Sequence, residues 1–146
     1  TSSPDFISPA MYRQYVHAYH RQLVEGLHAA GCQTTVMHIC GRTEPIIPDV
    51  AATGTDVMDI DWQVDPVRAL ELAGSHVAGP RMCLRGNIDP VSTLLYGTPE
   101  LVEEQVTDLL TRMVGRGHLI LSSGCDVPPN TPPANVQALV RAGRRF

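Results

Sequence analysis

The sequence contains few aromatic side chains, which make up 5% of its 146 residues, and it has no long apolar run. None of its apolar stretches approaches the roughly 20 residues that a membrane-spanning helix needs. Residues 1–6 lack the basic and then apolar pattern of a secretory signal. We therefore expect a cytoplasmic protein without a membrane partner.

The chain also lacks an excess of positive charge, since its formal net charge is -4. This charge gives no electrostatic reason to bind nucleic acid, and a few arginines near the C-terminus do not change that. Four cysteines are too sparse for a disulfide-rich scaffold. In a reducing compartment they are expected to be buried thiols or metal ligands.

The composition is otherwise that of a globular domain, with 43% hydrophobic and 18% charged residues. No low-complexity linker interrupts residues 1–146, so we expect a single unit with one core. Helix starts are indicated where proline follows a side chain that can cap the first N–H groups. This pattern occurs at Ser8-Pro9, Asp65-Pro66, Asp89-Pro90, Thr98-Pro99 and Thr131-Pro132.

The first of these starts predicts one long amphipathic helix over residues 9–30, because apolar residues recur there at steps of three and four. Its stripe of Tyr12, Tyr15 and Tyr19 is expected in the core. The last predicted helix carries Val136, Leu139 and Val140 on its apolar face.

Four short apolar runs, rich in β-branched residues, alternate with the helices. Such continuous runs are typical of buried parallel strands. The predicted fold is therefore α/β, with four parallel βα units in series. The strands are expected at residues 34–39, 56–60, 82–85 and 119–122.

The side chains capable of chemistry follow the strands, at the edge where parallel α/β proteins bind ligands. His38 and Cys40 share one face of an extended segment, and Cys125 follows the last strand. One imidazole and two thiols form a ligand set that zinc prefers. The spacing alone also fits a core thiol beside a hydrogen-bonded histidine.

Geometry restricts how these three residues can meet. In a flat sheet the first and fourth strands lie roughly 14 Å apart, whereas zinc–ligand bonds are about 2.0–2.3 Å long. We therefore expect the sheet to curve as in a barrel, with the loop through Gly124 covering the remaining distance. Four βα units are half of an eight-stranded barrel, so we expect the free edges to pair with an N-terminal half or a second copy.

Other strand-end residues have weaker patterns. Asp59 is expected either to orient His38 or to be an ordinary strand-end carboxylate. Arg85 and Asp89 are candidates for orienting a carboxylate or sulfonate, although Asp89 is more simply a helix cap. Cys32 and Cys83 are predicted to be small core residues.

Six motifs follow one another along the chain: ISP (7–9), VMHICG (36–41), DIDW (59–62), LRGNIDP (84–90), GTPE (97–100) and GCDVPPNTP (124–132). Together they resemble the C-terminal half of the uroporphyrinogen decarboxylase superfamily, almost from end to end of the chain. The decarboxylases usually have histidine at the position of Cys125. A cysteine there, combined with His-x-Cys, resembles the zinc-dependent cobalamin methyltransferase branch instead.

This resemblance implies a (β/α)8 barrel in which His38, Cys40, Cys125 and a carboxylate hold zinc. The carboxylate position matches Asp61, where the methyltransferase branch usually has glutamate. Asp59, Asp61 and Arg85 are the expected catalytic residues.

The implied reaction transfers a methyl group between a methyl-corrinoid and a thiol substrate held as a zinc-bound thiolate, because zinc deprotonates thiols near neutral pH. Zinc and cobalamin are the implied cofactors, and a small thiol and a corrinoid protein the implied partners. Two alternatives are a metal-free decarboxylase of the tetrapyrrole type and a non-catalytic half-barrel.

Overall fold

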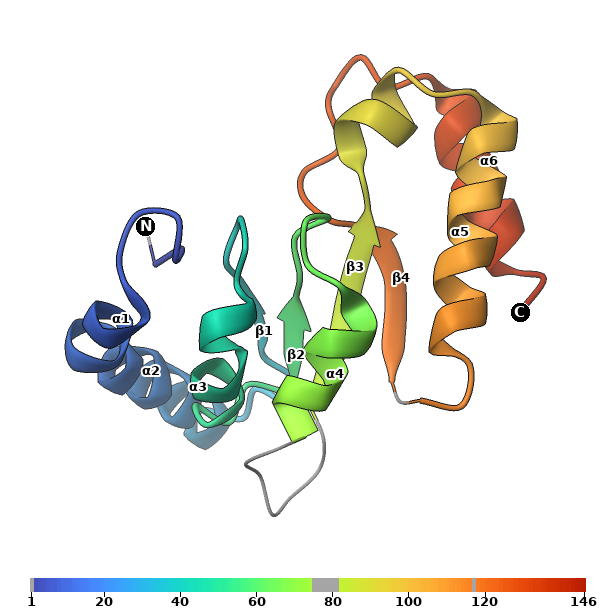
Figure 1. Ribbon diagram of the computed structural model, residues 1–146. Helices are drawn as coiled ribbons and strands as arrows, with labels where there is room; N and C mark the ends of the chain where they lie inside the picture. The colour runs from blue at the N-terminus through green and yellow to red at the C-terminus, as the bar shows by residue number, and fades with distance from the viewer. Residues whose placement is uncertain (1, 75–81, 117) are drawn as a thin grey trace.

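The computed structural model describes residues 2–74, 82–116 and 118–146. Its centre is one parallel sheet with the strand order β1-β2-β3-β4, which confirms the predicted α/β fold class (Figure 1). Each strand lies beside the next one along the chain, as in a series of βα units. The strands are β1 (Val36–His38), β2 (Val57–Asp59), β3 (Cys83–Ile88) and β4 (Leu119–Ser123).

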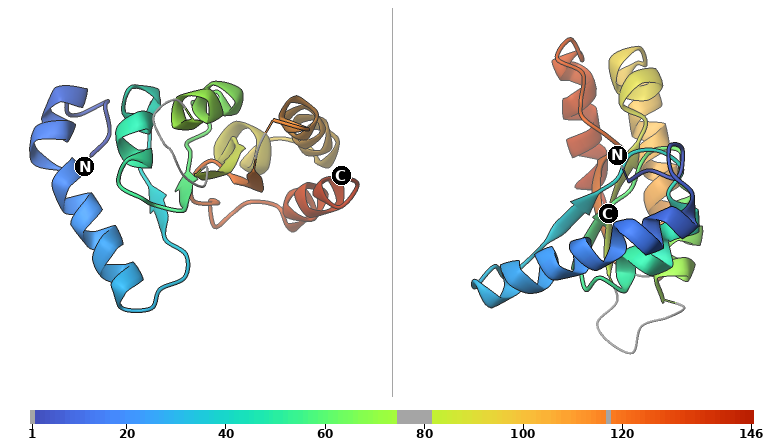
Figure 2. Two further views of the ribbon diagram at one scale, coloured as in Figure 1. Left: turned by 90° about the horizontal axis from the view of Figure 1, so that it is seen from below. Right: turned by 90° about the vertical axis from the view of Figure 1, so that its left-hand side faces the viewer.

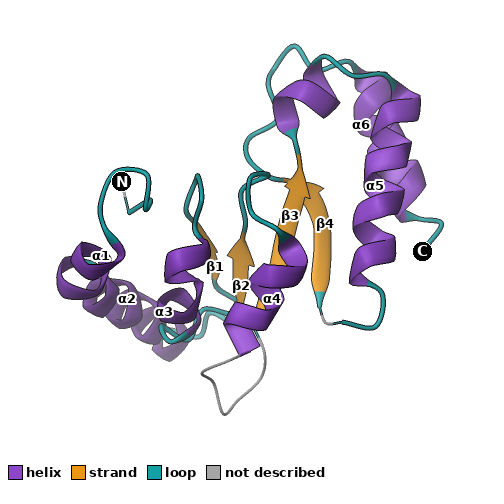
Figure 3. Cartoon of the chain, viewed as in Figure 1, coloured by secondary structure: helices purple, strands orange, loops and turns teal. Residues whose placement is uncertain are grey.

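Helices precede β1 and follow every strand (Figure 3). Viewed from below, α3, α4 and α5 lie along one side of the sheet (Figure 2). No helix among the described residues is both long and apolar enough to cross a membrane. The helices are α1 (Pro9–Tyr15), α2 (His17–Ala29), a 3-10 turn (Glu44–Ile46) with α3 (Ile47–Ala51), α4 (Pro66–Gly74), a π-helical turn (Pro90–Leu95) with α5 (Pro99–Met113), and α6 (Pro133–Gly143).

Four of the five predicted helix caps are present. The side chains of Ser8, Asp65, Asp89 and Thr98 accept hydrogen bonds from backbone N–H groups of the first helical turn. The prediction at Thr131 was wrong, because α6 begins one residue later. Two prolines stand in succession there, and a residue before proline is pushed out of the helical region.

The single helix predicted over residues 9–30 was also wrong, since it breaks at Val16, where φ is -120°. The break allows the Tyr12 hydroxyl to approach within 3.0 Å of His20 Nδ1. Eight residues of straight helix would separate their backbones by about 12 Å. Tyr12 is therefore buried as predicted, whereas Tyr15 and Tyr19 are exposed, contrary to the prediction.

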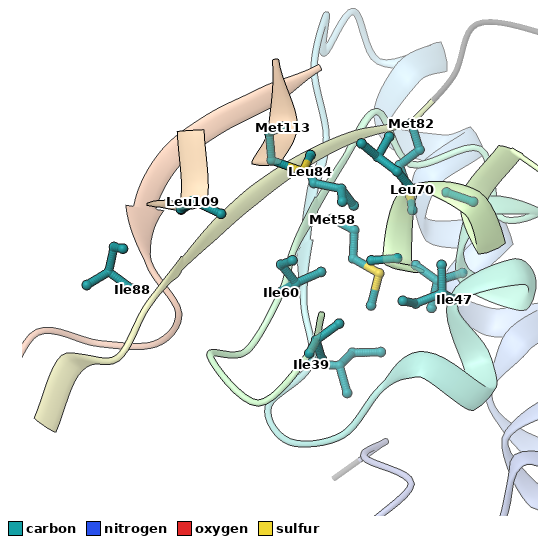
Figure 4. Packing of buried hydrophobic residues seen from close by; sticks show 14 of the residues in the cluster. Ile39, Ile47, Met58, Ile60, Leu70, Met82, Leu84, Ile88, Leu109 and Met113 are labelled. Atoms are coloured by element: carbon teal, nitrogen blue, oxygen red, sulfur yellow. The ribbon is translucent and has the colours of Figure 1, made fainter. Parts of the chain in front are cut away.

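The core lies between the sheet and its covering helices (Figure 4). Strand register places Met37, Met58, Leu84 and Leu119 in one row, and all four side chains pack into this core. Because side chains alternate along a strand, the following row points to the opposite face. That second row, which leads to the candidate site, consists of His38, Asp59, Arg85 and Ile120.

Helix α6 packs only in part through its predicted apolar face, where Leu139 contacts the core. Val136 and Val140 are exposed, whereas Asn135, Ala138 and Ala142 are buried. The Asn135 side-chain amide donates to the carbonyl oxygens of Leu94 and Gly97, at 2.8 and 2.9 Å. Asn135 thus connects α6 to the chain that leads into α5.

Replacing Asn135 with alanine is expected to lower the free energy of unfolding by about 1–3 kcal/mol, because buried carbonyl groups lose their donor. Denaturant unfolding of the complete protein measures this change. The control is Gln137→Ala, because Gln137 lies on the same helix and is exposed. Equal stability losses in both variants would contradict a specific role for Asn135.

Candidate metal centre

His38, Cys40 and Cys125 meet at the carboxyl ends of β1 and β4, although these strands are not neighbours in the sheet. His38 Nε2 lies 3.0 Å from Cys40 Sγ, and Cys125 Sγ lies 3.9 Å from each of those two atoms. The predicted convergence of the three side chains is therefore present.

These separations are close to what one tetrahedral metal ion requires. Zinc bonds of about 2.0–2.3 Å place a nitrogen and a sulfur ligand about 3.6 Å apart and two sulfur ligands about 3.8 Å apart. No other group of three potential metal-binding side chains occurs in the described ranges, 2–74, 82–116 and 118–146. The donor set and its spacing fit zinc.

Gly124 positions Cys125 through a close approach of two loops. A Cβ atom at position 124 would lie 2.3 Å from the Trp62 backbone nitrogen and 2.7 Å from its Cα. Only glycine therefore lets the chain after β4 lie against the chain after β2. This contact carries Cys125 inward toward β1, as the curvature argument predicts.

The orientation of His38 is set by the backbone of β2. Its Nδ1 lies 3.1 Å from the carbonyl oxygen of Asp59. Since a carbonyl oxygen only accepts hydrogen bonds, Nδ1 carries the proton of the neutral ring, and the Nε2 lone pair faces the two thiols. The main chain of Asp59 therefore orients His38, whereas the Asp59 carboxylate lies 3.6 Å from Nδ1, too far for a normal hydrogen bond.

The Asp59 carboxylate pairs with Arg85. Arg85 Nη2 lies 2.8 Å from Asp59 Oδ2, and His38 Nδ1 lies 3.6 Å from that same oxygen. The carboxylate is nearly buried, whereas the arginine side chain is 42% exposed.

The predicted helix cap at Asp89 is confirmed, because one of its oxygens accepts from the N–H groups of Val91 and Ser92.

Asp61 does not join the group of ligand atoms formed by the described residues. Its Oδ2 accepts a 2.8 Å hydrogen bond from the Gly41 N–H group. Its Oδ1 accepts from the backbone and side chain of Gln63, at 3.0 and 3.3 Å. The Asp61 side chain is buried, so its bond to Gly41 is shielded from water, whereas Gln63 itself is exposed.

Burial and the neighbouring Cys125 raise the pKa of the Cys40 thiol, and the charges of Asp61 and Asp126 raise it further. The thiol therefore keeps its proton at neutral pH, and a bound cation must displace that proton.

Of the remaining cysteines, Cys83 is half-buried and Cys32 is exposed, so the prediction of a core position for Cys32 was wrong.

Asn87 contributes to the site in a way that its sequence position did not predict. Its side-chain amide donates to the carbonyl oxygens of Asp61 and Val64, at 3.2 and 2.7 Å. It thereby fixes the loop after β2, against which Gly124 packs. Its place two residues after the predicted strand 82–85 was the available signal, but its partners depend on the fold of the neighbouring loop.

Comparison with known proteins assigns the chain to a family. The family model described as uroporphyrinogen decarboxylase (URO-D) matches residues 1–146. The chain belongs to the uroporphyrinogen decarboxylase family.

Members of this family with different activities resemble the chain about equally. A uroporphyrinogen decarboxylase of Synechococcus sp. (strain CC9605) is 33% identical over 94% of the chain and 37% of its own length. The methylcobamide:CoM methyltransferase MtbA of Methanosarcina mazei is 32% identical over the whole chain and 40% of its own length. Overall identity therefore does not distinguish decarboxylation from methyl transfer.

A solved structure agrees with the fold. A methyltransferase from Methanosarcina mazei superimposes with a TM-score of 0.83 at 30% identity, covering 99% of the chain and 40% of that protein. The chain thus spans about two fifths of the relatives it matches. Its four βα units correspond to part of a family barrel, as the resemblance implies.

Replacing Gly124 with alanine is expected to displace the loop that carries Cys125, because the added methyl group would overlap the Trp62 backbone. The zinc affinity of the complete protein should fall by about 10- to 100-fold, as for other changes to groups that support metal ligands. Competition with a chromophoric chelator measures the affinity.

Gly26→Ala is the matched control, because nothing lies within 4 Å of a Cβ atom placed there. Wild-type zinc affinity in Gly124→Ala would contradict the role of the contact with Trp62.

Proposed function

We propose that this chain belongs to a zinc-dependent enzyme that transfers a methyl group between a methyl-corrinoid and a small thiol. The observation that carries the proposal is the grouping of His38, Cys40 and Cys125, whose ligand atoms all lie within 4.8 Å of one another. The similarity to a methylcobamide:CoM methyltransferase supports it.

His38, Cys40 and Cys125 would hold the zinc ion. Bound zinc would lower the pKa of a substrate thiol and so supply a thiolate nucleophile near neutral pH. Two cysteine thiolates add negative charge to the centre, which keeps a substrate sulfur more electron-rich than a site of three neutral histidines would.

Arg85 is the proposed binding group for an anionic part of the substrate. It stands in the same row as His38 on the face of the sheet that carries the site. Asp59 holds one end of its guanidinium group, and the arginine side chain is 42% exposed. An anionic substrate could therefore approach the exposed part of this guanidinium group close to the metal centre.

The proposed enzyme needs further barrel strands in addition to the four strands of this chain. The outer edges of β1 and β4 have no strand beside them within the described residues. We propose that residues 1–146 form a single partial barrel whose edges pair with an N-terminal half or with a second copy. A corrinoid protein remains the proposed donor partner and the cytoplasm the proposed location, because thiols stay reduced there.

Uroporphyrinogen decarboxylation is the second candidate, favoured by the 33% identity to a protein of that name. It gives no role to two thiols that meet one imidazole. Zinc analysis of the complete protein, together with the visible spectrum of added methylcobalamin during incubation with a thiol, separates the two candidates. A metal-free protein that leaves methylcobalamin unchanged and decarboxylates a porphyrinogen would support the second.

Cys125→Ser is expected to lower the zinc affinity of the complete protein by more than about 100-fold, because a thiolate ligand is lost. Methyl transfer from methylcobalamin to the thiol should fall with it. Zinc analysis and the loss of the methylcobalamin spectrum measure the two effects.

The control is Cys32→Ser, since Cys32 is exposed and its thiol donates to the Thr34 carbonyl oxygen, away from the centre. Undiminished zinc in Cys125→Ser would overturn the proposal.

Arg85→Gln is expected to raise KM for a thiol that carries a carboxylate or sulfonate by about 10- to 100-fold, because a charge-assisted hydrogen bond is lost. Its effect on an uncharged thiol such as 2-mercaptoethanol should be small. Steady-state kinetics with both thiols measure the difference.

Arg68→Gln provides the comparison, because Arg68 is exposed on α4 and pairs with Glu71. Equal losses of activity toward both thiols in Arg85→Gln would exclude anion binding by Arg85.

A further inference from the structure

Asp61 fixes the turn that follows Cys40. Its Oδ2 accepts from the N–H group of Gly41, the residue directly after Cys40, at 2.8 Å. Gly41 has φ +87°, and a Cβ atom there would lie 2.1 Å from Asp5 Oδ2. On the other side of the turn, Asp5 accepts from the Arg42 N–H group at 3.1 Å. The main chain after Cys40 is thus held from both sides.

The remaining oxygen of Asp61 is also engaged. Oδ1 accepts from the backbone N–H and the side-chain amide of Gln63, so the carboxylate also closes the loop after β2. Asp61 lies outside the group of ligand atoms that are within 4.8 Å of one another, so its carboxylate would have to move to reach an ion held there. Such a movement would disturb its bond to the Gly41 N–H group, and a buried N–H group without a partner is unfavourable.

The length of the side chain favours the same conclusion. Aspartate is one methylene shorter than the glutamate expected at this position from the resemblance to the methyltransferase branch. A shorter side chain that is already bound to Gly41 does not extend into the group formed by His38, Cys40 and Cys125.

We propose that Asp61 is a positioning residue for Cys40 and not a metal ligand. The metal centre then has three protein ligands, and its fourth position is open to the substrate thiol. This inference rests on the proposed zinc centre, but it makes a separate claim about the number of protein ligands.

A matched control exists at the opposite ends of the same two strands. Asp56, directly before β2, accepts from the N–H group of Thr35, directly before β1, at 2.7 Å. Asp56 and Asp61 therefore each hold the chain beside β1 through one backbone N–H group. Only Asp61 lies at the end that carries the metal ligands.

The test uses the complete protein and four variants: Asp61→Asn, Asp61→Ala, Asp56→Asn and Cys125→Ser. Asparagine retains an oxygen for the Gly41 N–H group but is a poor zinc ligand. If Asp61 only positions Cys40, Asp61→Asn should bind one zinc ion with an affinity within about tenfold of wild type, whereas Asp61→Ala should bind it about 10- to 100-fold more weakly. Asp56→Asn should bind zinc as wild type does.

A second measurement reports directly on the fourth position. The cobalt(II)-substituted protein is titrated with 2-mercaptoethanol, and the sulfur-to-cobalt charge-transfer absorption follows the binding of this thiol. With an open position, wild type and Asp61→Asn should bind the thiol equally tightly. If Asp61 were a ligand, the thiol would have to displace it in wild type, and Asp61→Asn would bind the thiol at least about tenfold more tightly.

The outcomes separate this inference from the proposed function. Loss of zinc in Asp61→Asn by more than about 100-fold, or tighter thiol binding by that variant, would overturn the positioning role and leave the zinc centre intact. A wild-type protein without zinc, or Cys125→Ser with undiminished zinc, would overturn the centre itself. Far-UV circular dichroism confirms that each variant is folded.

Discussion

The contact between Gly124 and the backbone of Trp62 is the constraint on which the candidate centre depends. Without it, the ligands would stand on strands that a flat sheet keeps far apart. Because position 124 has no side chain, the loop after β4 crosses the end of the sheet and delivers Cys125 to His38 and Cys40. Asn87 secures the other side of this contact by holding the loop after β2.

The sheet divides its side chains between stability and chemistry. The row through Met58 and Leu84 packs against the helices and supplies the core. The next row, through His38, Asp59 and Arg85, carries charge on the opposite face, where the protein places its reactive groups. A change in strand register by one residue would exchange these rows, so the same packing that stabilises the fold also determines which groups reach the site.

Much of this arrangement follows from the sequence, because its strongest signals are local. Proline after a capping side chain located the helix starts, and apolar runs located the strands and hence His38 and Cys40. The failures arise where burial depends on distant packing. The periodicity of apolar residues placed Tyr15 and Val140 on the apolar faces of their helices. Both side chains are nevertheless exposed, because no described residue covers them, and the small residue Ala138 is the one that is buried in α6. The hydrogen bond between Asp61 and the Gly41 N–H group could not be predicted from the sequence either, because it joins two loops whose conformations depend on the folded sheet.

The hydrogen bond between His38 Nδ1 and the carbonyl oxygen of Asp59 has a consequence for how this family can diverge. The acceptor belongs to the main chain, so no substitution at position 59 removes it. The ring orientation of His38 therefore depends on the pairing of β1 and β2 and not on any particular side chain at position 59. Evolution can change the carboxylate beside the histidine, and with it the charge of the pocket, while the imidazole continues to present the same nitrogen.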